Sequence, residues 1–438
     1  MNNKYTKAVI VVTSLFFMWG FITVLVDSLI PRLKEIFELT FFQAGLVQFA
    51  FFIAYGLISI PAGSLLAKIG YKKGMLLGLA AMGIGCLLFI PAASMRMFSL
   101  FMLGYFVLAG GITVLQVAAN PYVSVLGSEK TASSRLILSQ AFNSLGTAIA
   151  PIIGAVYLLS DNIKTSAEIK ALAEGDKLAY FSSEAAAVKT PFVVLAGSLL
   201  LLALLIAIFK LPQILSENNV KGGYAKARTN QKLMMGALGI FVYVGAEVSI
   251  GSYLVNYFLD MNLAESIKSS NSMSSLSSSL LKQDLNAVDS KGIVAAFVTF
   301  YWTGAMVGRF IGSLLTRVIA PGKVLAFFGL GAIVMICVSM STTGFVSMWS
   351  ILAVGLFNSI MFPTIFTIAI EDLGELKPQG SGILCTAIAG GAFIPPLYGF
   401  LTDNIGFKMA FILVIVCYAY ILFYGWKNRN PQYSSTAA

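Results

Sequence analysis

The sequence contains no histidine and few charged residues of either sign. Histidine is the side chain that most often serves as a general base or a metal ligand, so its absence disfavours an enzyme built on either chemistry. Charged residues make up 11% of the chain, whereas soluble domains carry about 25%. A water-facing surface cannot be built from so few charges, so the composition excludes a soluble globular protein.

Paired cysteines and an ATP-binding motif are also absent. The four cysteines, Cys86, Cys337, Cys385 and Cys417, lie inside apolar segments and show no paired spacing. We therefore predict packing roles for them rather than disulfides or metal ligands. The phosphate-binding motif G-x-x-x-x-G-K-[ST] does not occur, so no ATP-driven step and no cofactor are expected.

Apolar runs near twenty residues recur along the whole chain, of which 58% is hydrophobic. Runs of this length are typical of helices that cross a bilayer. The strands of an outer-membrane barrel would alternate polar and apolar residues over about ten positions, and the sequence lacks that pattern. The sequence thus predicts an all-α polytopic membrane protein. Its twelve predicted transmembrane helices are 8–31, 41–67, 74–94, 97–125, 134–159, 190–211, 234–259, 292–316, 323–342, 346–371, 380–402 and 408–426.

The basic residues indicate how the chain is oriented in the membrane. They gather in the short loops on the side where the chain begins, while the long loops 160–189 and 260–291 lie on the other side. Short basic loops favour the cytoplasmic side, so both termini are predicted to be cytoplasmic. The net charge of +10 is then a topology signal, and no nucleic acid partner is expected. We expect a bacterial cytoplasmic (inner) membrane protein that contacts membrane lipid and functions as a monomer.

Two short motifs occur twice at nearly the same spacing. Gly63-Ser-Leu-Leu-Ala-Lys68 ends the second span, and Gly312-Ser-Leu-Leu-Thr-Arg317 ends the eighth. Leu126-Gly-Ser-Glu-Lys130 follows the fourth span, and Leu373-Gly-Glu-Leu-Lys377 follows the tenth. The repeat predicts two pseudo-symmetric six-helix bundles. The predicted domains are an N-terminal bundle at 1–212, a cytoplasmic linker at 213–232 and a C-terminal bundle at 233–438.

Three charged residues fall inside the predicted spans. An ionised side chain at the centre of a spanning helix costs about 2.5–3.5 kcal/mol, which makes each a functional candidate. Asp27 either binds a coupling cation or substrate hydroxyls in a central cavity, or it pairs at the membrane interface with Arg32 or Lys34. Glu247 lies in mid-span, and the next span supplies Arg309 as its one nearby basic partner. We predict a coupling role for Glu247 and a structural role for Arg309.

Amide side chains form a second group of candidates inside the membrane. Gln116 and Asn120 are four residues apart, and Gln140 and Asn143 are three apart, so each pair shares one face of its helix. Amides both donate and accept hydrogen bonds, which suits a ligand with several hydroxyls, although they equally join helices to one another. The predicted substrate-binding residues are Gln48, Gln116, Asn120, Gln140, Asn143, Asn358 and the aromatic Trp19.

Several stretches resemble a known transporter family. The run Gly63 to Lys73, with Gly70 near its end, is similar to the loop motif between the second and third helices of the major facilitator superfamily, although Ala67 stands where that motif has aspartate. Further stretches resemble the fucose–galactose–glucose symporters, and together the chain is most similar to their glucose/galactose transporter branch. These stretches are Asp27-Ser-Leu-Ile-Pro31, Thr40-Phe-Phe-Gln43-Ala-Gly45-Leu-Val-Gln48, Ala118-Ala-Asn120-Pro121-Tyr122, Gln140-Ala-Phe-Asn143-Ser-Leu-Gly146, Tyr243-Val-Gly-Ala246 and Phe362-Pro-Thr-Ile-Phe366.

The resemblance implies the major facilitator fold and cation-coupled symport of a monosaccharide. Asp27 matches the aspartate of the first helix in the fucose symporter, whereas Gln116 replaces its fourth-helix glutamate and Glu247 replaces its seventh-helix glutamine. We therefore expect glucose or galactose uptake by alternating access, with Asp27 and Glu247 binding Na⁺ or H⁺ and Na⁺ slightly favoured. Fucose or N-acetylglucosamine is the alternative substrate, and a membrane sugar receptor is the alternative class of protein. The residues expected to act in structure or gating are Gly63, Gly70, Arg309, Gly312 and Arg317.

Overall fold

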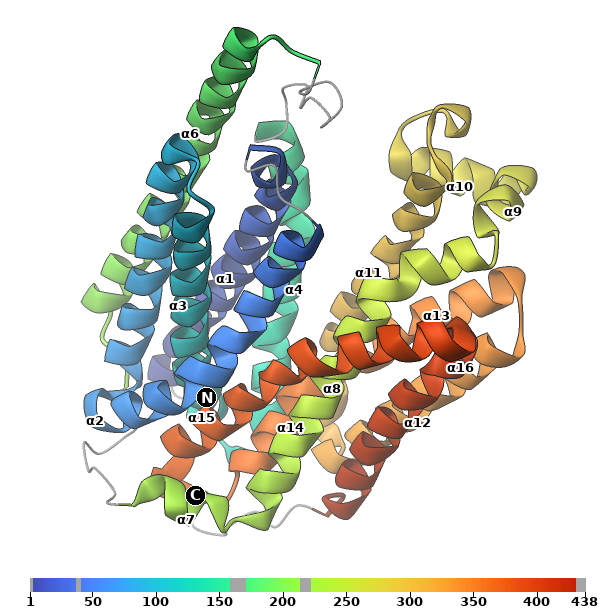
Figure 1. Cartoon of the computed structure of the whole chain (residues 1–438). Coiled ribbons are helices and arrows are strands. Elements are labelled where there is room, and N and C mark those ends of the chain that lie inside the picture. Colours follow the sequence, from blue (N-terminus) through green and yellow to red (C-terminus); the bar gives the residue numbers. More distant parts are fainter. Residues whose placement is uncertain (1–2, 37–40, 158–170, 213–221, 431–438) are drawn as a thin grey trace. The chain divides into compact units, whose positions relative to one another are not determined.

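The computed structural model describes residues 3–36, 41–157, 171–212 and 222–430 (Figure 1). Within these ranges, the side chains of residues 3–5, 26–36, 41–48, 152–157, 178 and 184–188 lie outside the description. Every regular element among the described residues is helical. Two compact units make up the chain: the first contains residues 1–132, 142–233 and 370–387, and the second contains 133–141, 234–369 and 388–438.

The first unit is built around α2, which packs along α3 and α6 and also contacts α15. The non-helical Gly70, at φ +80°, interrupts α2, and a residue with a side chain would be strained there. The break lies between the second and third predicted spans. The helices of this unit are α1 (Asn3–Ile36), α2 (Phe41–Met95), α3 (Phe98–Val125), the greater part of α4 (Ala132–Tyr157), α6 (Glu174–Ile208), α7 (Gly223–Arg228) and α15 (Lys377–Thr386).

The second unit repeats this plan. In it α12 packs on α16, and α11 packs on α13. Gly406, at φ +79°, interrupts α16 as Gly70 interrupts α2, and the predicted tenth span is divided after Asn358 into two helices. The helices are α8 (Gln231–Asp260), α9 (Leu263–Ser269), α10 (Asn271–Leu281), α11 (Ser290–Val318), α12 (Pro321–Ser341), α13 (Gly344–Asn358), α14 (Met361–Ile370) and α16 (Gly390–Lys427).

Each unit also contains a short segment that the sequence repeat assigns to the other half of the chain. In the first unit, α15 packs against α2 and α3, and Ser381 Oγ donates to the Val117 carbonyl at 2.8 Å. In the second unit, the start of α4 contacts α11, where Ser134 Oγ donates to the Ser313 carbonyl at 2.7 Å. The predicted domain boundaries at 212 and 232 stay a prediction.

The predicted class, an all-α polytopic membrane protein, is confirmed. Among the described residues, nine helical stretches are long and apolar enough to cross a membrane. Two of them, Phe49–Met95 and Gly374–Lys427, run for 47 and 54 residues. Each is therefore long enough for two membrane passes, which meet at the glycine that interrupts the helix. Each of the twelve predicted spans overlaps a described helix.

The structure differs from the sequence-based prediction in two outer loops. Helix α6 begins at Glu174, well inside the segment 160–189 that we expected to be a loop. Helices α9 and α10 lie inside the expected loop 260–291. For α6 the reason is that hydropathy identifies only the apolar part of a helix, whereas polar and alanine-rich turns extend it toward Glu174. The helices α9 and α10 are short and separate, and their sequences are too polar for hydropathy to detect them.

Candidate functional site

A buried group of tyrosines surrounds Asn358 at the end of α13. Asn358 Nδ2 donates to the Tyr301 hydroxyl at 2.7 Å, and the Tyr418 hydroxyl donates to Asn358 Oδ1 at 2.6 Å. The three side chains come from α13, α11 and α16 and are fully buried. Both ends of one amide are thus used to connect three helices of the second unit.

Glu247 of α8 belongs to the same polar region. The Tyr243 hydroxyl, one turn earlier on α8, donates to the Glu247 carboxylate. That carboxylate also interacts electrostatically with Tyr301 and Tyr418, and it is only partly buried. We call Tyr243, Tyr301, Asn358 and Tyr418 the phenol–amide cluster. The Glu247 carboxylate thus lies among the hydroxyls and the amide of this cluster, inside a membrane helix bundle.

Arg309 of α11 lies within electrostatic reach of Glu247. Its Nε donates to the Ser359 carbonyl at 3.2 Å, where α13 and α14 separate, and its Nη1 donates to the Gln140 carbonyl at 3.5 Å. The side chain is partly buried. Arg309 was the basic partner available to Glu247 from the next span, and the two side chains interact electrostatically in the structure.

The predicted amides of the fourth span differ in their surroundings. Gln116 Nε2 donates to the Tyr55 hydroxyl at 2.5 Å, and both side chains are buried. Asn120, one turn further along α3, is fully buried, and neither its Nδ2 nor its Oδ1 has a hydrogen-bond partner among the described residues. An unpaired buried amide costs about 1–3 kcal/mol, so Asn120 has hydrogen-bonding capacity to spare among the described residues.

Asn143 lies at the contact between α4 and α1, and Trp19 of α1 is next to Gly20 in the sequence. Asn143 Nδ2 donates to the Phe16 carbonyl at 2.9 Å, and Gly20 lets the two helices approach, because a Cβ there would lie 2.7 Å from Asn143 Nδ2. The buried Trp19 ring lies 5.6 Å from the Phe16 ring. Gln140 belongs to the second unit, so the predicted amides of the fifth span are divided between the two units.

The side chains of Asp27 and Gln48 lie outside the described residues, although both positions fall in helices. Within the part of the chain that the structure describes, no three acidic or cysteine side chains gather as they would around a metal ion. The Na⁺ site expected near Asp27 and Glu247 therefore stays a prediction.

The repeated motifs lie at close helix contacts. A Cβ at Gly63 would lie 2.7 Å from the Pro378 carbonyl oxygen and would overlap the Tyr224 hydroxyl. A Cβ at Gly312 would overlap the Ile360 side chain. Arg317, the last residue of the second motif, is exposed.

Tyr224 makes a contact between α7 and α2 that the sequence did not predict. It lies on α7, inside the predicted linker, and its hydroxyl donates to the Ile60 carbonyl at 2.6 Å. Burial raises the pKa of Tyr224 to about 12, so the hydroxyl stays protonated at neutral pH. No sequence pattern connects α7 to α2, because their contacting residues are far apart in the chain.

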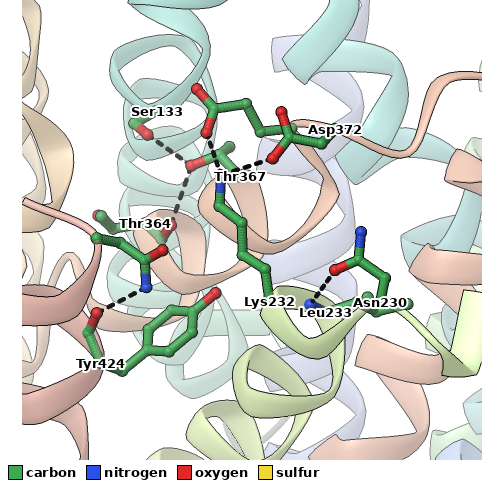
Figure 2. Close-up of polar contacts among 10 residues, drawn as sticks. Ser133, Asn230, Lys232, Leu233, Thr364, Thr367, Asp372 and Tyr424 are labelled. Carbon is green, nitrogen blue, oxygen red and sulfur yellow. Dashed lines mark hydrogen bonds and ion pairs between the residues drawn. The ribbon is translucent and has the colours of Figure 1, made fainter. Parts of the chain in front are cut away.

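Each unit also has a polar contact of its own near the end of α14 in the sequence. In the first unit, Lys232 Nζ lies 2.5 Å from Glu371 Oε2 and 3.1 Å from Asp372 Oδ2; the pair with Asp372 is drawn in Figure 2. Burial raises the pKa of Glu371, and Lys232 opposes that shift. In the second unit, the Ser133 and Thr367 hydroxyls are 2.5 Å apart, also in Figure 2.

Comparisons with known proteins agree with this architecture. A family model of the Major Facilitator Superfamily matches residues 9–394. The chain is 48% identical over 426 residues to a glucose/galactose transporter of Brucella abortus, covering 97% of this chain and 94% of the relative. It is 34% identical over 436 residues to the L-fucose-proton symporter of Escherichia coli, covering 97% of this chain and 93% of the relative. A crystal structure of the major facilitator transporter FucP in the outward conformation superimposes with a TM-score of 0.87 at 32% identity, covering 98% of this chain and all of the other.

Proposed function

Because the chain belongs to the major facilitator superfamily, and within it to the fucose–galactose–glucose symporter family, we propose that it takes up glucose or galactose together with a cation by alternating access. The observation that carries the proposal is the partly buried Glu247 carboxylate, which lies beside the phenol–amide cluster within a membrane helix. An embedded carboxylate can bind a cation and so link it to the transported solute.

The chemistry of the cluster suits a sugar. Phenols and amides each donate and accept hydrogen bonds, and a hexose presents several hydroxyls that need both. Asn120 offers an amide that has no partner among the described residues of the first unit, and Asn358 offers one whose present partners are phenols. We propose that these amides, with Gln116, bind the hydroxyls of the substrate.

Cation coupling follows from the cost of an embedded charge. An ionised carboxylate inside the membrane has a high free energy, and a bound H⁺ or Na⁺ removes much of that free-energy cost. A carrier loaded with both cation and sugar therefore changes conformation more readily than a half-loaded one, which is a condition for symport. We propose that Glu247 and Asp27 supply this charge.

The remaining features of the proposal follow the family. The protein is a multi-pass membrane protein, and we propose the bacterial cytoplasmic (inner) membrane, with both termini cytoplasmic, as its location. We propose that it works as a monomer surrounded by membrane lipid, without a cofactor other than the coupling ion.

Uptake by the purified protein in vesicles tests the function. Labelled glucose, galactose, fucose and N-acetylglucosamine are offered, with Na⁺ and pH gradients imposed separately. We expect accumulation of glucose or galactose driven by one of the gradients. Fucose is the second candidate, favoured by the 34% identity to the L-fucose-proton symporter. The absence of exchange between labelled and unlabelled sugar would instead indicate a receptor.

A further inference from the structure

The start of α4 is attached to α11 by a short row of contacts. Ser134 Oγ donates to the Ser313 carbonyl at 2.7 Å, and Ser313 Oγ donates back to the Ser134 carbonyl at 3.2 Å. Ile137 of α4 lies next to Gly312, since a Cβ at Gly312 would be in ordinary contact with the Ile137 side chain at 3.9 Å. We call these contacts the α4–α11 seam. It connects a segment from the N-terminal half of the chain to a helix from the C-terminal half, so alternating access must break it.

Arg309 lies at the other end of the seam. It precedes Ser313 by four residues and so shares its face of α11. Its donation to the Gln140 carbonyl, at 3.5 Å, is at the outer limit for a hydrogen bond, whereas the one to the Ser359 carbonyl is 3.2 Å long. A guanidinium has five N–H donors, so one side chain can join α4, α11 and the break between α13 and α14.

The same guanidinium interacts with the Glu247 carboxylate. The titratable and charged groups that face Glu247 are Tyr243 on its own helix, Tyr301 and Arg309 on α11, and Tyr418 on α16. Of these described groups, Arg309 is the one that carries a positive charge, and the others are neutral phenols. A change in the charge of Glu247 therefore alters the electrostatic interaction energy of Arg309 more than that of the phenols.

We propose that Arg309 is a positioning residue that couples cation binding at Glu247 to the α4–α11 seam. The inference rests on the proposed symport function. An ionised Glu247 attracts the guanidinium and competes with the Gln140 and Ser359 carbonyls for it. A cation bound at Glu247 removes that attraction and changes how firmly Arg309 holds the start of α4. Because a coupling free energy acts in both directions, opening the seam must in turn change the cation affinity of Glu247.

Replacing Arg309 tests the proposal through the cation dependence of transport. The full-length protein is reconstituted in vesicles, and counterflow is measured across a range of pH and Na⁺ concentrations. In Arg309→Met, the cation concentration that gives half-maximal counterflow is expected to fall at least about tenfold, because a carboxylate without a neighbouring positive charge binds a cation more tightly. Arg309→Lys keeps the charge and is expected to restore most of the cation dependence. Lys291→Met, at the exposed start of α11, is the matched control and should leave it unchanged.

Two comparisons separate a failure of this inference from a failure of the proposed function. In the Glu247→Gln background, adding Arg309→Met should leave counterflow and its cation dependence as in the single variant. An unshifted cation dependence in Arg309→Met, with accumulation lost in Glu247→Gln, overturns the role of Arg309 and leaves symport standing. Accumulation retained in Glu247→Gln overturns the coupling role of Glu247 and this inference with it. Arg309→Gln gives the same measurement if the Met variant does not fold.

Discussion

Replacing Asn358 by leucine is expected to destabilise the second unit strongly, although the two side chains are similar in size. The change removes the hydrogen bonds to Tyr301 and Tyr418, which are 2.7 and 2.6 Å long, and leaves two fully buried phenols without them. A buried donor or acceptor left unpaired costs about 1–3 kcal/mol. Two such groups give an expected loss of about 2–6 kcal/mol in the free energy of unfolding.

Removing the orphaned hydroxyls separates hydrogen bonding from packing. Tyr301→Phe and Tyr418→Phe, added to Asn358→Leu, replace the unpaired phenols by apolar rings of nearly the same shape. We expect the triple variant to recover most of the lost stability, because replacing both partners of a hydrogen bond by apolar groups is nearly neutral. Sugar uptake should stay low, since the cluster has lost three of its four polar side chains.

The assay is thermal unfolding of the purified variants in detergent, combined with counterflow in vesicles. The Tyr301→Phe and Tyr418→Phe double variant with Asn358 intact is the control. If Asn358→Leu were as stable as the original protein, or if the triple variant recovered none of the loss, the reasoning about the cluster would be refuted. Full uptake in the triple variant would show that these polar groups do not bind sugar.

Three further changes test other contacts. Gly312→Val should reduce stability and uptake together, because a Cβ there overlaps the Ile360 side chain; thermal unfolding and counterflow measure both, and an unchanged variant would contradict the close contact. Tyr224→Phe should lower stability by about 1 kcal/mol through loss of the bond to the Ile60 carbonyl, and the deficit should be the same from pH 6 to pH 9 because the pKa of this phenol is raised to about 12. Lys232→Met leaves Glu371 half-buried without its cation, and burial raises the pKa of that carboxyl. The folded state then binds more protons than the unfolded one, so unfolding experiments should find this variant less stable at pH 8 than at pH 5; a deficit that grew toward acid pH would contradict the assignment.

Much of the architecture was accessible from the sequence, because hydropathy and the repeated Gly-Ser-Leu-Leu motif are local patterns. The motif predicted equivalent helix ends in the two halves, and the structure shows what each copy contacts. Gly63 meets Pro378 and Gly382 in the first unit, and Ser313 meets Ser134 in the second. Those partners were not predictable, since each pair is separated by a large part of the chain and no local pattern connects them.

The candidate site was predictable to a similar extent. Glu247 stood out as an embedded charge, and Tyr243 could have been added to it, because residues four apart share a helix face. Tyr301 and Tyr418 could not, since they come from two other helices and look like ordinary aromatic residues of a membrane span. The sequence also could not show that Asn143 is used to join α1 and α4 while Asn120 has no partner among the described residues.

The coupling role of Glu247 is tested most directly by comparing accumulation with exchange in Glu247→Gln. The variant keeps the size of the side chain and removes its charge, and Glu174→Gln, at the exposed start of α6, serves as the control. We expect Glu247→Gln to exchange labelled for unlabelled sugar across vesicle membranes but to accumulate none against a gradient. Accumulation equal to that of the unaltered protein would show that Glu247 does not bind the coupling cation.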